Sequence, residues 1–371
     1  MSDYAQQFAL NLRTLRKQKG LKQKAFAQQL GYSEKTVSKW ECGASIPSIE
    51  TLFSIAKLLQ TSIDDLFKTK EIYYLGIDGG GTKTELSLAD MAGNLVRTLK
   101  VEACNPIDIG FEASKNVLKD AIYKICQDIP FSSVCLFAGI AGGSSAGMQE
   151  RFYDFFKEFN FLTFSNDSDN KNIVAAGLGR RDGVTVILGT GICAYAQKDN
   201  KHTKVGGWGY LIDNGGSGYN LGRDALNAYF CALDGTGGET LLTDEIDAIY
   251  PGGTQEIMAY IYQGGKKAVA SFAPAVFSAL EKEDEIAKTI LEQNMKAAAL
   301  IIETAALRIS GEKIPVIVAG GLTKQPCVLE CLKKHLKDSE RFDISILTSA
   351  PVEGAVILAR ELMKEEDNFN A

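Results

Sequence analysis

The chain carries at residues 73–88 the sequence Tyr73-Tyr74-Leu75-Gly76-Ile77-Asp78-Gly79-Gly80-Gly81-Thr82-Lys83-Thr84-Glu85-Leu86-Ser87-Leu88, which decides the fold. An apolar run typical of a buried strand ends at Asp78, and a second, alternating strand begins after a turn of glycines, threonines and a lysine. Glycines let a backbone turn sharply and approach a ligand closely because they carry no Cβ atom. Backbone N–H groups, hydroxyls and a lysine suit phosphate oxygens, and a strand-end carboxylate suits the Mg²⁺ ion that screens them. The stretch therefore predicts a phosphate-binding β-hairpin with Asp78 as metal ligand; a hairpin without a ligand is the alternative.

The same pattern returns at residues 184–197. A buried strand over 184–188 ends at Gly189-Thr190-Gly191, and another strand follows over 192–197. Two strand–turn–strand units, each opening one half of the body, are typical of a duplicated fold that binds phosphates between two lobes. We therefore expect lobes at 71–183 and 184–371, with the closing helix at 352–364 as a candidate to pack on the first lobe.

Length and composition are those of a soluble protein of two or three domains. The 371 residues are 45% hydrophobic and 23% charged. Apolar runs fall far short of a membrane span, and the first seven residues lack the core of a signal peptide. Eight scattered cysteines without a Cys-x-x-Cys spacing indicate buried free thiols, and two histidines make a histidine-based triad improbable. These features predict a cytoplasmic protein without a membrane partner.

The N-terminal residues 1–70 differ from the rest in charge and in pattern. They hold 11 Lys+Arg and 6 Asp+Glu, which leaves 29 and 40 for the remainder, so a basic module precedes an acidic body. The module reads as a run of short helices in which Ser33 caps the third. Its sequence from Gln23-Lys24-Ala25-Phe26-Ala27 to Lys39-Trp40-Glu41-Cys42-Gly43 resembles the Cro/C1-type (XRE) helix-turn-helix family.

The resemblance implies that this module binds double-stranded DNA at an operator as a homodimer. The second helix of such a motif lies in the major groove with its N-terminal residues on base edges. A five-helix module for protein interaction is the alternative. The residues expected on DNA are Glu34, Lys35, Thr36 and Ser38 near the bases, Gln23 and Lys39 near phosphates, and Ser33 at the cap of the same helix.

The body alternates strands and helices. Strands are expected at 72–78, 83–90, 94–102, 134–140, 161–165, 184–188, 192–197, 314–319 and 344–347, with long helices over 254–309. Asp167 follows the strand at 161–165, where α/β sheets place reactive groups, although it also suits the N-cap of the next helix. Gly320 and Gly321 follow the strand at 314–319 and would admit an adenine ring, or form an ordinary strand–helix turn.

The order of these motifs resembles the BadF/BadG/BcrA/BcrD ATPase family, and within it the N-acetylglucosamine kinases, over roughly residues 72–362. The motifs that carry the resemblance are Asp78-Gly79-Gly80-Gly81-Thr82-Lys83-Thr84, Asn166-Asp167, Gly189-Thr190-Gly191, the loop from Gly207-Trp208-Gly209 to Gly216-Ser217, and Ala319-Gly320-Gly321. The resemblance implies an actin/hexokinase-like fold of two ribonuclease-H-like α/β lobes that binds ATP and Mg²⁺. It also implies phosphoryl transfer, which a protein promotes by positioning and charge neutralisation.

Roles follow from the resemblance residue by residue. ATP and its metal fall to Asp78, Gly79, Gly80, Gly81, Thr82, Lys83, Thr84, Gly189, Thr190, Gly191, Gly320 and Gly321. The sugar falls to Asn105, Asp167, Thr190, Asn214 and Ser217, with Asp167 as the catalytic base.

Two departures from the family pattern affect the expected activity. Ile192 stands where the second phosphate loop usually continues with serine, and Asn214 stands at the place of an aspartate in the sugar loop. We expect an ATP-dependent amino-sugar kinase attached to a DNA-binding domain. A regulator that senses a sugar with little turnover is the alternative. An activator ATPase of 2-hydroxyacyl-CoA dehydratases is disfavoured, because residues 166–177 contain no cysteine.

Overall fold

A computed structural model describes residues 3–68, 71–145 and 147–368 of the chain. Residues 69–70, at the expected junction between the first two domains, lie outside the described residues. The chain forms two compact units, residues 1–172 with 351–371 and residues 173–350.

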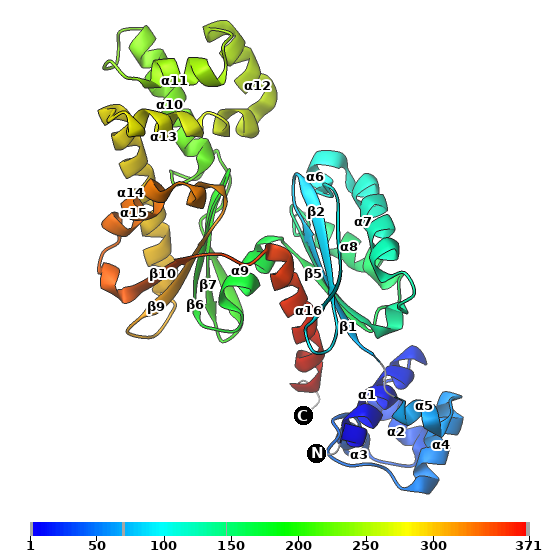
Figure 1. The fold of residues 1–371 in the computed structure, drawn as a ribbon. Helices are drawn as coiled ribbons and strands as arrows, with labels where there is room; N and C mark the ends of the chain where they lie inside the picture. Colours follow the sequence, from blue (N-terminus) through cyan, green and yellow to red (C-terminus); the bar gives the residue numbers. More distant parts are fainter. Residues whose placement is uncertain (1–2, 69–70, 146, 369–371) are drawn as a thin grey trace. The chain divides into compact units, whose positions relative to one another are not determined.

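The N-terminal domain is a bundle of five short helices, as the sequence predicted. Serine hydroxyls begin three of them: Ser33, Ser48 and Ser62 each accept a hydrogen bond from a backbone N–H in the first turn. The core contains fully buried Phe8 and Phe26. The helices are α1 (Asp3–Gln18), α2 (Gln23–Leu30), α3 (Glu34–Glu41), α4 (Ile49–Leu59) and α5 (Ile63–Phe67) (Figure 1).

The first unit also holds a five-stranded sheet in the order β3-β2-β1-β4-β5. Strand β1 pairs antiparallel with β2 and parallel with β4. Alternate side chains reach opposite faces: Leu75 and Ile77 pack with helices α7 and α8, whereas Tyr74 packs with α16. The elements are β1 (Tyr73–Gly79), β2 (Lys83–Ala89), β3 (Leu95–Glu102), α6 (Pro106–Ile109), α7 (Phe111–Cys126), β4 (Val134–Ile140), α8 (Met148–Lys157), β5 (Thr163–Asp167) and α16 (Pro351–Asn368).

Helix α16 lies close against β1. A Cβ atom at Gly76 would come within 2.5 Å of the backbone nitrogen of Val356, so a glycine is required there. The C-terminal helix therefore belongs to the packing of the first sheet although it follows the second unit in the chain.

The second unit repeats the topology. Its sheet has the order β10-β9-β6-β7-β8, in which β6 pairs antiparallel with β7 and parallel with β9, as β1 does with β2 and β4. Helices α10 and α14 cover one face, and α9 packs on the other. The elements are α9 (Asn170–Leu178), β6 (Gly183–Leu188), β7 (Ile192–Lys198), β8 (Lys201–Val205), α10 (Gly218–Leu233), α11 (Leu242–Ile249), α12 (Thr254–Ala270), α13 (Ala273–Glu281), α14 (Glu285–Ala306), β9 (Ile314–Ala319), α15 (Pro326–His335) and β10 (Phe342–Ile346).

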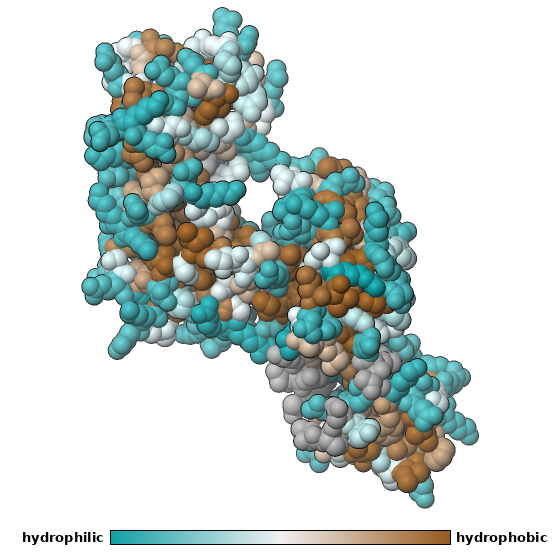
Figure 2. Space-filling model, viewed as in Figure 1, coloured by the Kyte–Doolittle hydropathy of each residue, from teal (hydrophilic) through white to brown (hydrophobic). Residues whose placement is uncertain are grey.

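The duplicated α/β architecture is confirmed, and the local differences have physical causes. Strand β8 escaped prediction because it is a polar edge strand, Lys201-His202-Thr203-Lys204-Val205. Strand β5 begins and ends two residues later than expected, so that Asp167 lies inside it. Polar side chains cover much of the face shown in Figure 2. Among the described residues, no helix is both long and apolar enough to cross a membrane.

Candidate functional site

The first hairpin loop joins β1 to β2 through residues 80–82. Gly80 donates its backbone N–H to the carbonyl of Lys83 over 3.0 Å, which closes the turn. A Cβ atom at Gly79 would lie 2.6 Å from the Sγ atom of Cys104, and one at Gly80 would lie 3.1 Å from the carbonyl oxygen of Lys83. Neither Gly79 nor Gly80 has a positive φ, so close packing, and not backbone conformation, is the reason for glycine at these positions.

Lys83 is the cation of this loop. Its Nζ lies 2.6 Å from Oε1 of Glu85, and Lys100 approaches the same oxygen to 3.4 Å. The hydrogen bond to Glu85 raises the pKa of Lys83, so the ammonium stays charged. About half of the Lys83 side chain is exposed.

Asp78 lies half-buried near the end of β1. Asn172 of α9 donates through Nδ2 to Oδ1 of Asp78 over 2.7 Å and to the carbonyl of Ile77 over 3.2 Å. Burial raises the pKa of Asp78 to about 6, while the Asn172 hydrogen bond opposes that rise. Gly139 on β4 makes room for the amide, since a Cβ there would lie 2.3 Å from Oδ1 of Asn172.

Two further carboxylates lie where β5 ends and α9 begins: Asp167 is the last residue of β5, and Asp169 directly precedes α9. Asp167 accepts from the backbone N–H of Ser168 over 2.7 Å and lies 3.3 Å from Nζ of Lys171. Asp169, directly before α9, accepts from the Ser168 hydroxyl over 3.1 Å. Burial raises the pKa of Asp169, and its charge adds to the rise in the pKa of Asp78. Asp169 was not among the residues predicted for the site, although its position directly before the helix at 170–178 could have indicated it.

Asn105 lies near the same loop. It caps α6, with Oδ1 accepting from the N–H of Ile107 over 3.0 Å and Nδ2 donating to Oδ2 of Asp108 over 3.1 Å. A Cβ at Gly81 would lie 3.7 Å from that Asp108 oxygen. The first unit thus gathers Asp78, the hairpin loop, Asn105 and the β5–α9 carboxylates at the ends of β1, β4 and β5.

The second hairpin loop, Gly189-Thr190-Gly191, is bound to the start of α10. The N–H of Gly218 donates to the carbonyl of Gly189 over 2.8 Å, and that of Tyr219 donates to the carbonyl of Thr190 over 3.1 Å. Ser217 is the buried N-cap of α10, and its hydroxyl donates to Oδ1 of Asn220 over 2.5 Å. The Ser217 hydroxyl therefore has its partners within the protein.

A cavity of about 440 Å³ opens beside this loop within the second unit. Thr190 and Gly321 line it, and Pro274 and Phe277 of α13 form part of its apolar wall. At Gly320, φ is +103° and a Cβ would come within 2.4 Å of the Leu188 carbonyl oxygen, so only glycine fits. The size, the apolar wall and the few polar groups suit a nucleoside.

The loop over residues 206–217 is the last predicted element. The Asp213 carboxylate accepts from the N–H groups of Trp208 over 3.1 Å and Gly209 over 3.0 Å, and Asn214 is exposed. Trp208 is 75% exposed. The Asp213 carboxylate therefore stabilises the conformation of its own loop through these two hydrogen bonds.

The helix-turn-helix residues form a separate candidate interface. Ser33, Glu34, Lys35 and Lys39 are exposed on or beside α3. Thr36 and Ser38 are half-buried, and the Thr36 hydroxyl lies 2.8 Å from that of Ser33 at the helix cap.

Gln23 has a structural partner inside the domain. It donates to Oε2 of Glu41 over 2.8 Å. Glu41 in turn forms a buried, bidentate ion pair with Arg16 at 2.5 and 2.9 Å.

Two duplicated sheets, each with a glycine–threonine hairpin at its central strand, define an ATPase of the actin/hexokinase-like class. The chain belongs to the BadF/BadG/BcrA/BcrD ATPase family, whose model matches residues 75–359. A helix-turn-helix model matches residues 12–66, so the N-terminal domain is a helix-turn-helix domain.

Known proteins resemble both parts. An N-acetylmuramic acid/N-acetylglucosamine kinase of Clostridium acetobutylicum is 28% identical over 302 residues, which cover 78% of this chain and 98% of that protein. The crystal structure of a Chromobacterium violaceum protein, proposed to be an N-acetylglucosamine kinase, matches with a TM-score of 0.65 and 25% identity over 78% of this chain and all of that one. The HTH-type transcriptional activator BcrR of Enterococcus faecalis is 38% identical over 69 residues, 19% of this chain and 34% of that protein.

Proposed function

We propose that the protein transfers the γ-phosphoryl group of ATP to a hydroxyl of an amino sugar of the N-acetylglucosamine class. The observation that carries the proposal is the half-buried carboxylate of Asp78, held by Asn172 beside a glycine hairpin and next to Asp169. A phosphoryl-transfer site needs a metal-binding carboxylate, a base and N–H-rich loops, and this set supplies them. The relationship to the Clostridium kinase supports the choice of sugar.

The residues present suit Mg²⁺ bound mainly through phosphates. Mg²⁺ is commonly held by one or two carboxylates together with substrate phosphates, and Asp78 offers one carboxylate already fixed in direction. When bound, the ion would neutralise charge on the phosphates. Within the first unit, Lys83 and the N–H groups of its hairpin loop would contact phosphate oxygens. Within the second unit, the cavity beside Gly321 would take the nucleoside.

Either of two carboxylates could accept the proton of the sugar hydroxyl. Asp167 remains the base predicted from the family pattern, although its carboxylate already pairs with Lys171 over 3.3 Å. Burial raises the pKa of Asp169, which makes its carboxylate a stronger base. We therefore propose Asp169 as the base and Asp167 as a residue that helps to orient this connection.

The test is ADP release over a panel of hexosamines and their N-acetyl derivatives, with Mg²⁺ present and the Asp78→Asn variant as the blank. We expect sugar-dependent ADP from the wild type and almost none from the variant. Equal ADP release from both proteins with every sugar would overturn the kinase proposal.

We also propose that the helix-turn-helix domain binds operator DNA as a homodimer. Lys35 and Lys39 are exposed on α3, so Lys35→Ala together with Lys39→Ala should weaken binding about tenfold and flatten its salt dependence. Electrophoretic mobility shift on genomic fragments at two salt concentrations measures both effects. Lys57→Ala on α4 is the matched control. Unchanged affinity in the double variant would place the DNA contact on another surface.

The second candidate is a regulator that binds the sugar without useful turnover. It is favoured by Asn214 in the loop where family members carry an aspartate. A sugar that raises the melting temperature in the presence of an ATP analogue, but yields no ADP with ATP, would decide for this function.

A further inference from the structure

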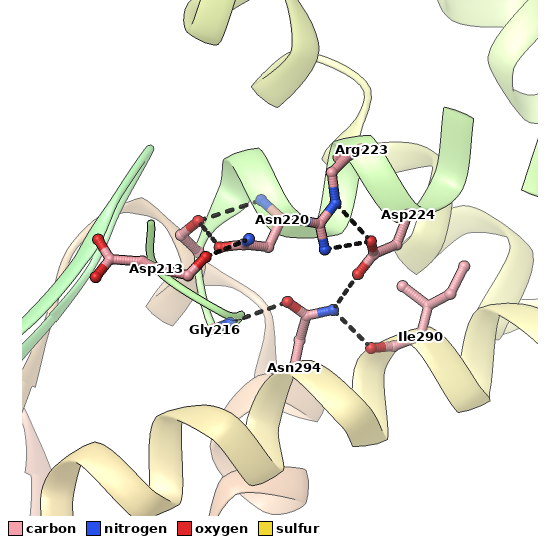
Figure 3. Close-up of polar contacts among 8 residues, drawn as sticks. Asp213, Gly216, Asn220, Arg223, Asp224, Ile290 and Asn294 are labelled. Atoms are coloured by element: carbon pink, nitrogen blue, oxygen red, sulfur yellow. Dashed lines mark hydrogen bonds and ion pairs between the residues drawn. The ribbon is translucent and has the colours of Figure 1, made fainter. Parts of the chain in front are cut away.

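Helix α14 presents a buried amide to the loop that precedes α10. Asn294 is 2% exposed in the middle of this otherwise apolar helix face. Its Oδ1 accepts from the backbone N–H of Gly216 over 2.9 Å. Its Nδ2 donates to Oδ2 of Asp224 and to the carbonyl of Ile290, both over 2.9 Å, as Figure 3 shows.

The three partners fix the orientation of the amide. Gly216 offers only a donor, whereas Asp224 and Ile290 offer acceptors, so the oxygen must face the loop and the nitrogen must face α10 and its own helix. Neither an aliphatic side chain nor a carboxylate satisfies all three. A buried polar group without partners is costly, and the Gly216 N–H would be such a group if Asn294 were absent.

The loop passes through a narrow space at this point. Gly215 and Gly216 have φ values of +141° and +86°. A Cβ at Gly216 would lie 2.6 Å from Cδ1 of Ile192, and one at Gly215 would lie 3.0 Å from Cβ of Ala297. The backbone therefore adopts a conformation that glycine alone accepts, close against α14, and Asn294 is the side chain that binds it there.

A second buried amide holds the other side of the loop. Asn220, fully buried on α10, donates through Nδ2 to the carbonyl of Asp213 over 3.3 Å. Asn214, the exposed residue at the predicted sugar position, thus has a fixed residue on each side: Asp213 through Asn220, and the Gly215-Gly216 pair through Asn294 (Figure 3). Two residues after Gly216, the N–H of Gly218 binds the carbonyl of Gly189 in the second hairpin loop.

We infer that Asn294 is a positioning residue for the substrate: through Gly216 it fixes the loop that presents Asn214, and it does so without contacting the sugar. The inference rests on the proposed function for its effect on the sugar. Its effect on the loop itself is independent of any turnover.

The experiment combines hydrogen exchange with kinetics on the full chain. In Asn294→Leu the Gly216 N–H loses its acceptor, so exchange in a peptide spanning 213–218 should become at least about tenfold faster. The KM for the sugar should rise about tenfold while the KM for ATP changes less than about threefold, because neither Asn294 nor Gly216 lines the cavity beside Gly321.

A charge exchange supplies matched controls. Asp224→Asn keeps an acceptor for Nδ2 of Asn294 and should leave exchange and KM near the wild-type values. Asn294→Asp removes that donor and sets a second carboxylate against Asp224, so it should loosen the loop. Adding Asp224→Asn to Asn294→Asp returns a donor opposite the new carboxylate and should restore much of the protection.

The outcomes separate the two claims. Unchanged loop exchange in a folded Asn294→Leu variant overturns the positioning role, and so does an Asn294→Asp variant that the second change fails to rescue. If Asn294→Leu does not fold, the Asn294→Asp and double variants carry the same test. If the wild type lacks sugar-dependent ADP release, the proposed function fails while the exchange data still decide the role of Asn294.

Discussion

The two glycine–threonine hairpins share a topology but differ in chemistry. The first, between β1 and β2, has the half-buried Asp78 at its start and the cationic Lys83 at its end. The second, between β6 and β7, has no charged residue from Leu188 to Ile192. It is held instead by backbone hydrogen bonds to the first turn of α10. The duplicated fold therefore carries one charged hairpin loop and one neutral hairpin loop.

The difference assigns a separate task to each hairpin. A charged loop with a fixed carboxylate suits the metal and the transferred phosphoryl group, where charge changes most during the reaction. A neutral loop of N–H groups beside the cavity proposed for the nucleoside suits binding that is equal in the ground state and the transition state. Changes in the first hairpin should therefore lower kcat, and changes in the second should raise the KM for ATP.

The largest effect is expected at Asp78. Asp78→Asn removes the carboxylate proposed to bind Mg²⁺ and should lower kcat for the sugar on the order of 1000-fold. Steady-state ADP release measures it. Glu85→Gln, on the strand opposite, is the control and should retain most activity. Comparable losses in both variants would show that the hairpin tolerates no polar change and that Asp78 has no special role.

The β5–α9 carboxylates should show the next largest effect. Asp169→Asn should reduce kcat about 100-fold through loss of the base, and Asp167→Asn should reduce it less. Single-turnover phosphorylation of the sugar separates this loss from slow product release. The reverse ranking would return the role of base to Asp167, as the family pattern predicts.

Changes in the second hairpin should affect mainly the KM for ATP, whereas changes in the first should affect kcat. Thr190→Val removes a hydroxyl that lines the nucleoside cavity and should raise the KM for ATP about tenfold with little change in kcat. Initial rates at varied ATP and saturating sugar measure this split. A fall in kcat at constant KM would contradict the neutral, binding role of this loop.

The smallest effect concerns stability without ligands. Burial raises the pKa of Asp78 from 3.8 to about 6, so its contribution to stability is present at low pH and is lost as the pH rises through that value. As the pH rises from 5 to 8, the unfolding free energy of Asp78→Asn should therefore increase by about 1 kcal/mol relative to that of the wild type. Urea unfolding without Mg²⁺ or nucleotide measures the difference.

Glu85 provides a control of opposite sign for this measurement. The hydrogen bond from Lys83 lowers the pKa of Glu85, so Glu85→Gln should lose stability relative to the wild type at pH values where the carboxylate is ionised. A difference between Asp78→Asn and the wild type that does not vary with pH would exclude a raised pKa at Asp78.

The sequence predicted the hairpins and the fold because both depend on local patterns. Apolar runs, glycine turns and capped helices stand in adjacent residues, so the duplicated lobes and the helix-turn-helix domain could be recognised. The side chains that support the site were not predicted from the sequence, because they hydrogen-bond to residues in distant segments of the chain. Asn172 lies 94 positions from Asp78 and reads as one more polar residue at the start of a helix. Asn294 falls within a long amphipathic helix, 78 positions from Gly216.

The choice between Asp167 and Asp169 shows the same limit. The family pattern includes Asn166-Asp167 as adjacent residues, so the sequence alone was enough to single out Asp167. The burial of Asp169 depends instead on where α9 begins against the sheet. Only the folded arrangement brings the charge of Asp169 to bear on Asp78.

The most direct test of the central claim is mass spectrometry of the sugar after incubation with Mg²⁺ and ATP, for the wild type and Asp78→Asn. We predict a phosphorylated amino sugar from the wild type and a yield lower on the order of 1000-fold from the variant. An unmodified sugar in every wild-type reaction, or equal product from both proteins, would contradict a kinase site at the first hairpin.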